Sequence, residues 1–125
     1  MSNHQMSDQG IELLMSIESF RGDPYDDQTG KVISKWVIGA TIGYGHLISL
    51  QEWNEFGAGY RNGITQEQAK TLFLKDLAPF VEGVNAKVTA SITQNQFDAL
   101  VILAFNIGLA NLATSSVLKL VNNPS

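Results

Sequence analysis

The sequence predicts an α+β fold, in which a small sheet-bearing lobe is followed by a mainly helical lobe. Apolar residues recur at helical spacing near the N-terminus, glycines and β-branched residues gather in residues 21–62, and helix-start signals lie in residues 63–125. A chain of 125 residues suits one compact domain that buries a core without disulfides. We therefore expect a single domain over residues 1–125, with a first helix at 8–20, a sheet lobe at 21–62 and a helical lobe at 63–125.

The composition argues against several classes of function. The chain has no cysteine, which excludes disulfides, thiolate nucleophiles and Cys-based zinc sites. Its formal charge of −4 argues against a broad nucleic-acid surface and against adhesion to an anionic membrane. No segment has the length of a transmembrane helix, or the basic start and apolar run of a signal peptide. We expect synthesis in the cytoplasm, no membrane insertion, and a separate route to any target outside.

The first helix is predicted over residues 8–20, capped by Ser7 or Asp8, and its apolar face carries a carboxylate. Four residues follow the spacing i, i+3, i+4 and i+7 and so share one stripe: Ile11, Leu14, Met15 and Glu18. Burial among apolar side chains would raise the pKa of Glu18, and a carboxylic acid protonated near neutral pH can act as a general acid. The alternative is that the helix rotates slightly and Glu18 lies at its polar edge.

Short strands are predicted after this helix. Residues 21–31, RGDPYDDQTGK, are rich in Gly, Pro and Asp, which is typical of a loop with turns. Residues 32–38 and 41–47 carry β-branched and aromatic side chains, and we expect both to be strands of a small sheet. Gly43 and Gly45 in the second of these strands indicate a turn, a bulge or a close approach of backbones.

The helical lobe contains two capping boxes. Thr65 with Gln68 begins a helix that we expect to reach Ala78, after which Pro79 begins a short successor helix over 80–85.

Thr93 with Gln96 begins a helix at 94–107. It is apolar nearly all round, which predicts a central buried helix, and Gly108 ends it. A last helix is expected over 115–122.

Two carboxylates are spaced so that they could act together. Glu18 and Asp27 are nine residues apart, with a helix end and a loop between them. Two carboxyl groups in unlike environments, one protonated and one ionised, are the minimum apparatus for glycoside hydrolysis. The alternative for Asp26 and Asp27 is a solvated turn beside Thr29.

The stretch TIGYGH at 41–46 is the most distinctive motif. It lacks the Gly-Lys-Ser/Thr of a phosphate-binding loop and the spacing of a dinucleotide fingerprint, so we expect no nucleotide site. His46 is one of two histidines, too few for a zinc hydrolase, and no nucleophile elbow supports a serine triad. Residues 23–31 lack the alternation of a calcium loop. We expect neither metal nor cofactor, and interpret His46 as a hydrogen-bonding residue at a strand end.

Together these residues resemble the phage-type lysozymes of glycoside hydrolase family 24, the T4 lysozyme family. The family pattern is a Glu at the end of the first helix, an Asp nine residues later, and a Thr that opens a Thr-x-Gly-x-Gly-His strand. Glu18, Asp27 and Thr41 fill these positions, and QNQFDALVILAFNIG at 94–108 resembles the family's central helix. The resemblance extends over about residues 11–120 and implies a lysozyme-like fold.

The resemblance also implies a function. The chain would be an inverting muramidase, such as a phage endolysin, that lyses bacteria by cleaving the β-1,4 linkage between N-acetylmuramic acid and N-acetylglucosamine in peptidoglycan. Glu18 would protonate the glycosidic oxygen, Asp27 would orient a water or stabilise positive charge on the sugar, and Thr41 would help to hold that water. Three further positions would line the sugar-binding cleft: Leu47, Phe105 and Ser116.

The chain departs from the family pattern at two places. Thirteen residues separate Asp27 from Thr41, which is a longer insertion than in T4 lysozyme. The chain also ends at Ser125, where family members continue through helices that cover the central one, so we expect a C-terminally truncated domain with apolar surface exposed over Leu100–Phe105. The chain is then a fragment, or a partner covers this surface, or the lobe closes differently. If the chain is complete, we expect a dimer or a metastable monomer. A truncated, non-catalytic peptidoglycan-binding module and a purely structural domain are the alternative functions.

Overall fold

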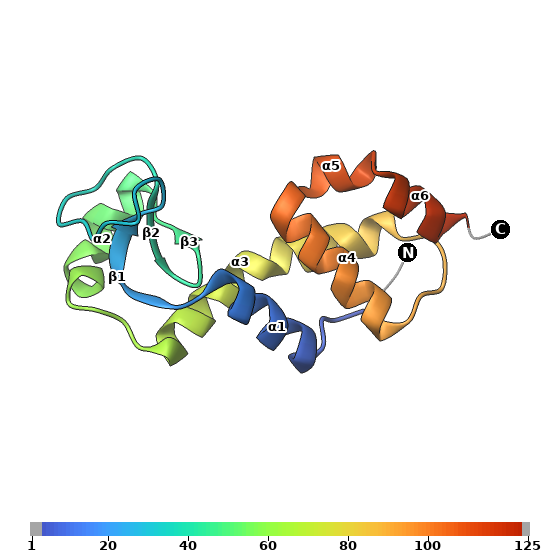
Figure 1. The fold of residues 1–125 in the computed structure, drawn as a ribbon, viewed down its shortest axis with the longest axis horizontal. Helices are drawn as coiled ribbons and strands as arrows, with labels where there is room; N and C mark the ends of the chain where they lie inside the picture. The colour runs from blue at the N-terminus through green and yellow to red at the C-terminus, as the bar shows by residue number, and fades with distance from the viewer. Residues whose placement is uncertain (1–3, 124–125) are drawn as a thin grey trace. The chain divides into compact units, whose positions relative to one another are not determined.

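The computed structural model describes residues 4–123, and the chain divides into two compact units. The sheet unit comprises Met15–Asp76, and the helical unit comprises Met1–Leu14 together with Leu77–Ser125. The elements follow one another along the chain as labelled in Figure 1. The boundaries between the units fall inside two helices, α1 (Asp8–Glu18) and α3 (Gln66–Lys87). Within the described residues, no helix is both long and apolar enough to cross a membrane.

The sheet unit contains a three-stranded antiparallel sheet and the helix α2 (Leu50–Arg61). The strands lie in the order of the chain: β1 (Arg21–Asp26), β2 (Ala40–Gly43) and β3 (His46–Leu47). Ala40 and Ile42 of β2 are fully buried and form a core cluster with Ile48 and with Trp53 of α2. Because side chains alternate along a strand, Thr41 between them belongs to the opposite face of the sheet.

Two predictions for this unit are wrong. Residues 21–31 were expected to form a loop, but Arg21–Asp26 pair with β2 across a register irregularity between Arg21 and Tyr25. These turn-forming residues can form a strand here because β1 lies at the edge of the sheet. Pro24 has no N–H to donate, and an edge strand tolerates this. Residues 32–38 were expected to form a strand, but they contribute only an isolated bridge between Val32 and Tyr25.

The helix α2 was not predicted. Its N-cap is Ser49, whose side chain accepts a hydrogen bond from the backbone N–H of Glu52 at 3.1 Å. The spacing Ser-x-x-Glu was therefore a helix-start signal. Gly57 and Gly59 lower helix propensity, and they masked this signal. In the structure, Gly57 permits close packing on Trp53, because a Cβ at position 57 would lie 3.2 Å from the Trp53 ring.

The helical unit matches the predicted pattern more closely. The central helix is α4 (Gln94–Ile107), with the bounds predicted, and its capping box between Thr93 and Gln96 is formed on both sides. Gly108 follows it with φ of 88°. Two short helices complete the unit, α5 (Leu109–Ala113), which was not predicted, and α6 (Ser116–Asn122), which begins one residue later than expected.

Two helix ends differ from the predictions. The helix α3 continues through Pro79 to Lys87, so the predicted break there is wrong. Leu77 and Val84, which lie on either side of Pro79, are buried, and this packing compensates for the hydrogen bond that proline removes. The helix α1 ends at Glu18 rather than at residue 20, because Ser19 adopts a left-handed conformation with φ of 63°.

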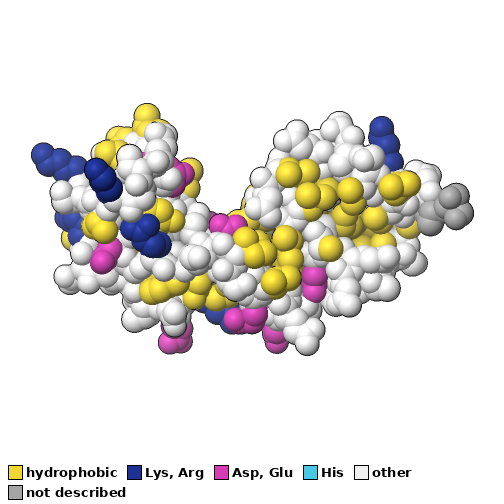
Figure 2. Space-filling model, in the orientation of Figure 1, with side chains coloured by type: hydrophobic (Ala, Val, Ile, Leu, Met, Phe, Trp, Pro, Cys, Tyr) yellow, Lys and Arg dark blue, Asp and Glu magenta, His cyan; other side chains and the backbone are white. Residues whose placement is uncertain are grey.

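The expected exposure of Leu100–Phe105 is wrong for three residues. Leu100, Val101 and Ala104 are buried, with α5 packed against α4. Hydrophobic side chains are visible on the surface over the helical unit in Figure 2. The exposed large hydrophobic residues of α6 are Val117 and Leu120, at 44% and 71%.

The N-terminal segment is tied to the helical unit by polar contacts. Ser7 is the cap of α1, since its Oγ accepts a hydrogen bond from the backbone N–H of Gly10 at 3.0 Å. The carboxylate of Asp98 on α4 in turn accepts hydrogen bonds from the backbone N–H and the hydroxyl of Ser7. The start of the helix that ends in Glu18 is therefore attached to the central helix.

We predict that Thr93→Ala lowers the free energy of unfolding by about 1 kcal/mol, because it removes the hydroxyl that accepts from the N–H of Gln96. Denaturant unfolding of the native protein and the variant measures the difference. Thr93→Ser, which keeps the hydroxyl, serves as the control and should lose far less. Equal losses from the two variants would contradict the role of the cap.

Candidate active site

Glu18 lies at the C-terminal end of α1, against the turn between β2 and β3. Leu14 and Met15 of its helix stripe are buried, and Glu18 itself is half-buried. A Cβ added to Gly45 in that turn would lie 3.2 Å from Oε2 of Glu18, so the carboxylate and the turn are in close contact. Burial raises the pKa of Glu18, which is the direction that a general acid requires.

The glycines of the TIGYGH motif make this contact possible. Gly43 and Gly45 have φ of 72° and 79°, values that L-residues with side chains rarely adopt. Gly43 also lies close to α3, since a Cβ there would approach the Cβ of Ala69 to 3.0 Å. The motif therefore forms a tight hairpin that packs on α3 with one glycine and on Glu18 with the other.

Asp27 and Thr41 converge on one carbonyl group. The backbone N–H of Asp27 donates to the carbonyl oxygen of Gly39 at 3.1 Å, and the hydroxyl of Thr41 donates to the same oxygen at 2.8 Å. Asp27 is exposed, whereas Thr41 is buried. Gly39 has φ of 99°, and a Cβ there would lie 2.5 Å from Oδ1 of Asp27. A glycine at this position is thus required for the carboxylate of Asp27 to lie where it does.

Tyr25 is a further residue of this region that was not predicted from the sequence. It is the cross-strand partner of Thr41, so the two side chains share one face of the sheet. Burial raises the pKa of Tyr25, and the negative charges of Asp27 and Glu18 raise it further, against the opposing effect of Arg21. Tyr25 lies two residues before Asp27, and residues at this spacing share one face of a strand. This signal was missed because residues 21–31 were predicted to form a loop.

The predicted sugar-binding residues divide between the two units. Leu47 pairs with Thr41 from the other side of β2 and is 63% exposed, so it extends the face of Tyr25 and Thr41. Phe105 and Ser116 belong to the helical unit. Phe105 is half-buried, with its ring centroid 5.2 Å from that of Phe80, and Ser116 is the exposed first residue of α6. Their role in sugar binding stays a prediction.

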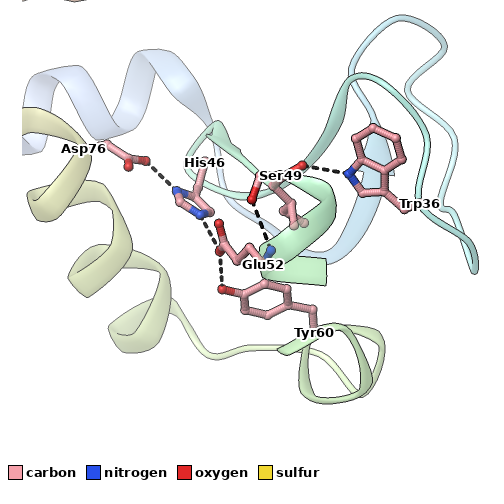
Figure 3. Close-up of polar contacts among 7 residues, drawn as sticks. Trp36, His46, Ser49, Glu52, Tyr60 and Asp76 are labelled. Atoms are coloured by element: carbon pink, nitrogen blue, oxygen red, sulfur yellow. Dashed lines mark hydrogen bonds and ion pairs between the residues drawn. The ribbon is translucent and has the colours of Figure 1, made fainter. Parts of the chain in front are cut away.

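His46 faces the other way and holds the sheet to two helices. It pairs with Ile42, which places it on the core side of the sheet. Its Nδ1 lies 2.7 Å from Oδ2 of Asp76 and its Nε2 lies 2.7 Å from Oε2 of Glu52, while the Tyr60 hydroxyl donates to the same Glu52 oxygen at 2.5 Å (Figure 3). This confirms the interpretation of His46 as a hydrogen-bonding residue.

The environment of His46 favours its charged form. Burial lowers its pKa, but the hydrogen bonds and charges of Asp76 and Glu52 together outweigh burial, so the pKa is raised. Ten residues line a cleft of about 560 Å³ beside this cluster: His46, Ser49, Gln51, Glu52, Glu55, Phe56, Tyr60, Leu72, Lys75 and Asp76. Among the described residues, no group of three His, Cys, Asp or Glu side chains is arranged to hold a metal ion.

Comparison with known proteins identifies the family. The family model described as phage lysozyme matches residues 15–125. The chain belongs to the phage lysozyme family. It is 33% identical over 117 residues to the endolysin of Acyrthosiphon pisum secondary endosymbiont phage 1. The match covers 94% of this chain and 69% of that protein. It is also 39% identical over 119 residues to the endolysin of Bacillus phage PZA, but spans only 41% of that protein's length.

Solved structures of phage lysozyme relatives have the same fold. The muramidase domain of SpmX from Asticaccaulis excentricus superposes with a TM-score of 0.74 at 38% identity, covering 96% of this chain and 71% of that one. A P22 lysozyme mutant superposes with a TM-score of 0.73 at 31% identity, covering 96% of this chain and 75% of that one. The predicted resemblance and the predicted α+β, lysozyme-like fold are therefore confirmed.

For this member of the phage lysozyme family, we predict that His46→Gln destabilises the fold in a pH-dependent way. Because the folded-state pKa of His46 is raised, its stabilisation is fully present below the unfolded value of about 6.5 and is lost as pH rises through the folded value. His46→Gln should lower the free energy of unfolding by about 2 kcal/mol at pH 6, because it replaces charged hydrogen bonds. The decrease should be smaller at pH 9. Urea unfolding at both pH values measures it, and equal losses would contradict the charged state of His46.

Proposed function

We propose that this chain is a muramidase that hydrolyses peptidoglycan with inversion, cleaving the β-1,4 linkage between N-acetylmuramic acid and N-acetylglucosamine. The observation that carries the proposal is the arrangement around β2. The half-buried Glu18, whose pKa is raised, lies against Gly45 in the turn that follows this strand. The exposed Asp27 and the buried Thr41 both donate a hydrogen bond to the carbonyl oxygen of Gly39, just before the strand. Two carboxyl groups held in unlike environments are what an acid and a base of glycoside hydrolysis need.

Glu18 is the general acid in this proposal. Its raised pKa favours the protonated carboxyl group, whose proton passes to the glycosidic oxygen as the bond from this oxygen to the anomeric carbon breaks. The leaving sugar departs as an alcohol, and Glu18 is left as a carboxylate until solvent returns the proton.

Asp27 and Thr41 hold the attacking water. The Thr41 hydroxyl proton is used in the hydrogen bond to Gly39, so its oxygen is available to accept a hydrogen bond from water. The Asp27 carboxylate accepts the other hydrogen of this water and receives its proton as the oxygen bonds to the anomeric carbon. Because water attacks the far face of the sugar directly, the configuration inverts and no covalent intermediate forms.

The relatives support the proposed substrate and its location. The relatives include endolysins of Bacillus, Salmonella and aphid-endosymbiont phages, and one solved neighbour is titled a muramidase domain. In this chain, Leu47, Phe105 and Ser116 are the proposed sugar-lining positions. The protein would be made in the bacterial cytoplasm and would act on the cell wall after release by a separate route.

We predict that Glu18→Gln lowers hydrolysis by at least about 100-fold, because glutamine cannot donate the proton. Two assays measure this, the loss of turbidity of outer-membrane-permeabilised bacteria and the release of reducing sugar from purified cell walls. Glu67→Gln on the exposed first turn of α3 is the matched control and should keep full activity.

Lysis by Glu18→Gln at the native rate would refute the role of Glu18. A native protein that binds cell walls without releasing reducing sugar would instead support the non-catalytic binding module. Proton NMR of the first product distinguishes the stereochemistry, since inversion of a β-linkage yields the α-anomer.

A further inference from the structure

The turn that carries Asp27 lies at the protein surface. Residues 27–30 are all exposed, so no buried side chain anchors them. Within the turn, the N–H of Gly30 donates to the carbonyl oxygen of Asp26 at 2.7 Å, and the N–H of Gln28 donates to the Asp26 carboxylate at 2.9 Å. These contacts shape the turn. Its position relative to the sheet depends on further polar contacts, one of which is the bond from Asp27 to Gly39.

Arg21 supplies a second contact between the sheet and this turn. Its Nη2 donates to the carbonyl oxygen of Gly30 at 2.9 Å. The same guanidinium lies over the ring of Tyr25, with Cζ 4.1 Å from the ring centroid. Arg21 thus contacts, with one planar group, both the far end of the Asp27 turn and the residue that pairs with Thr41.

Only arginine can make both contacts at once. Its planar guanidinium can stack on an aromatic face and still direct an N–H group outward in the same plane. A lysine ammonium is a compact point charge on a flexible stem, and it loses this fixed geometry. The charge of Arg21 also lowers the pKa of Tyr25, against the effect of Asp27 and Glu18.

We propose that Arg21 is a positioning residue for the hydrolysis: stacked on Tyr25 and bonded to Gly30, it fixes the turn that presents Asp27 to the attacking water. This inference rests on the proposed function of Asp27. Arg21 touches neither water nor sugar in this account, and it acts only through the turn and the Tyr25 ring.

The expected effect of Arg21→Lys is on turnover rather than on binding. A misplacement of about 1 Å can cost up to about 100-fold in rate, so we expect kcat on soluble, uncross-linked peptidoglycan to fall by about 10-fold with KM within about 2-fold. Arg61→Lys is the matched control, because Arg61 also stacks on an aromatic ring of the sheet unit, with Cζ 5.3 Å from the centroid of Trp53. It should keep the native kcat.

A double-mutant cycle separates positioning from an independent role. If Arg21 acts through Asp27, Arg21→Lys should lower kcat no further once Asp27→Asn is present. Tyr25→Leu, which removes the ring, provides a second route to the same effect, and its kcat loss should not add to that of Arg21→Lys. Additive losses in both cycles, or a fall in melting temperature with native kcat, would refute the positioning role and leave Arg21 a structural residue.

Amide hydrogen exchange tests the contact without any turnover. The amides of Asp27 and Gly30 are hydrogen-bonded, so they should exchange more slowly in the native protein than in Arg21→Lys, while Arg61→Lys leaves them unchanged. Unchanged exchange in Arg21→Lys would refute the inference even if the protein is active. If the native protein hydrolyses no peptidoglycan, the proposed function fails, and the exchange rates alone decide whether Arg21 holds the turn.

Discussion

The contact between the Glu18 carboxylate and the Gly45 turn is the constraint on which the site depends. It joins the end of α1 to the hairpin of β2 and β3, and it requires a residue without a side chain at a positive φ. The same closeness keeps water from part of the carboxylate and so raises its pKa. A larger residue at position 45 would be strained at this φ, and its Cβ would press against the Glu18 carboxylate.

The two faces of the small sheet carry different sets of side chains. One face carries Tyr25, Thr41 and Leu47 in a row across the three strands. On the other, His46 with Asp76 and Glu52 joins the sheet to α2 and α3 through charged hydrogen bonds. Thr41, which is proposed to help hold the attacking water, therefore lies on the face opposite the His46 cluster.

Local signals made part of this structure predictable, and non-local pairing hid the rest. The central helix α4 was predicted to its ends because Thr93 and Gly108 act on neighbouring backbone groups. The strand β1 was missed because its residues favour turns and only pairing with β2 makes them a strand. Glu18, Asp27 and Thr41 were predicted from motif spacing, and their roles stay proposals. The convergence of Asp27 and Thr41 on Gly39 depends on strand register, which no local pattern reports.

Titration of the Glu18 side chain shows directly whether this carboxyl group is suited to be the general acid. Carbon-13 NMR of the Glu18 carboxyl group, assigned by comparison with Glu18→Gln, gives its midpoint in the folded protein. We expect a midpoint above the value of about 4.3 for an exposed glutamate, because the contact with the hairpin turn buries the carboxylate. A midpoint at or below that value would mean that Glu18 is solvated at the helix edge, and it would contradict the assignment of Glu18 as the general acid.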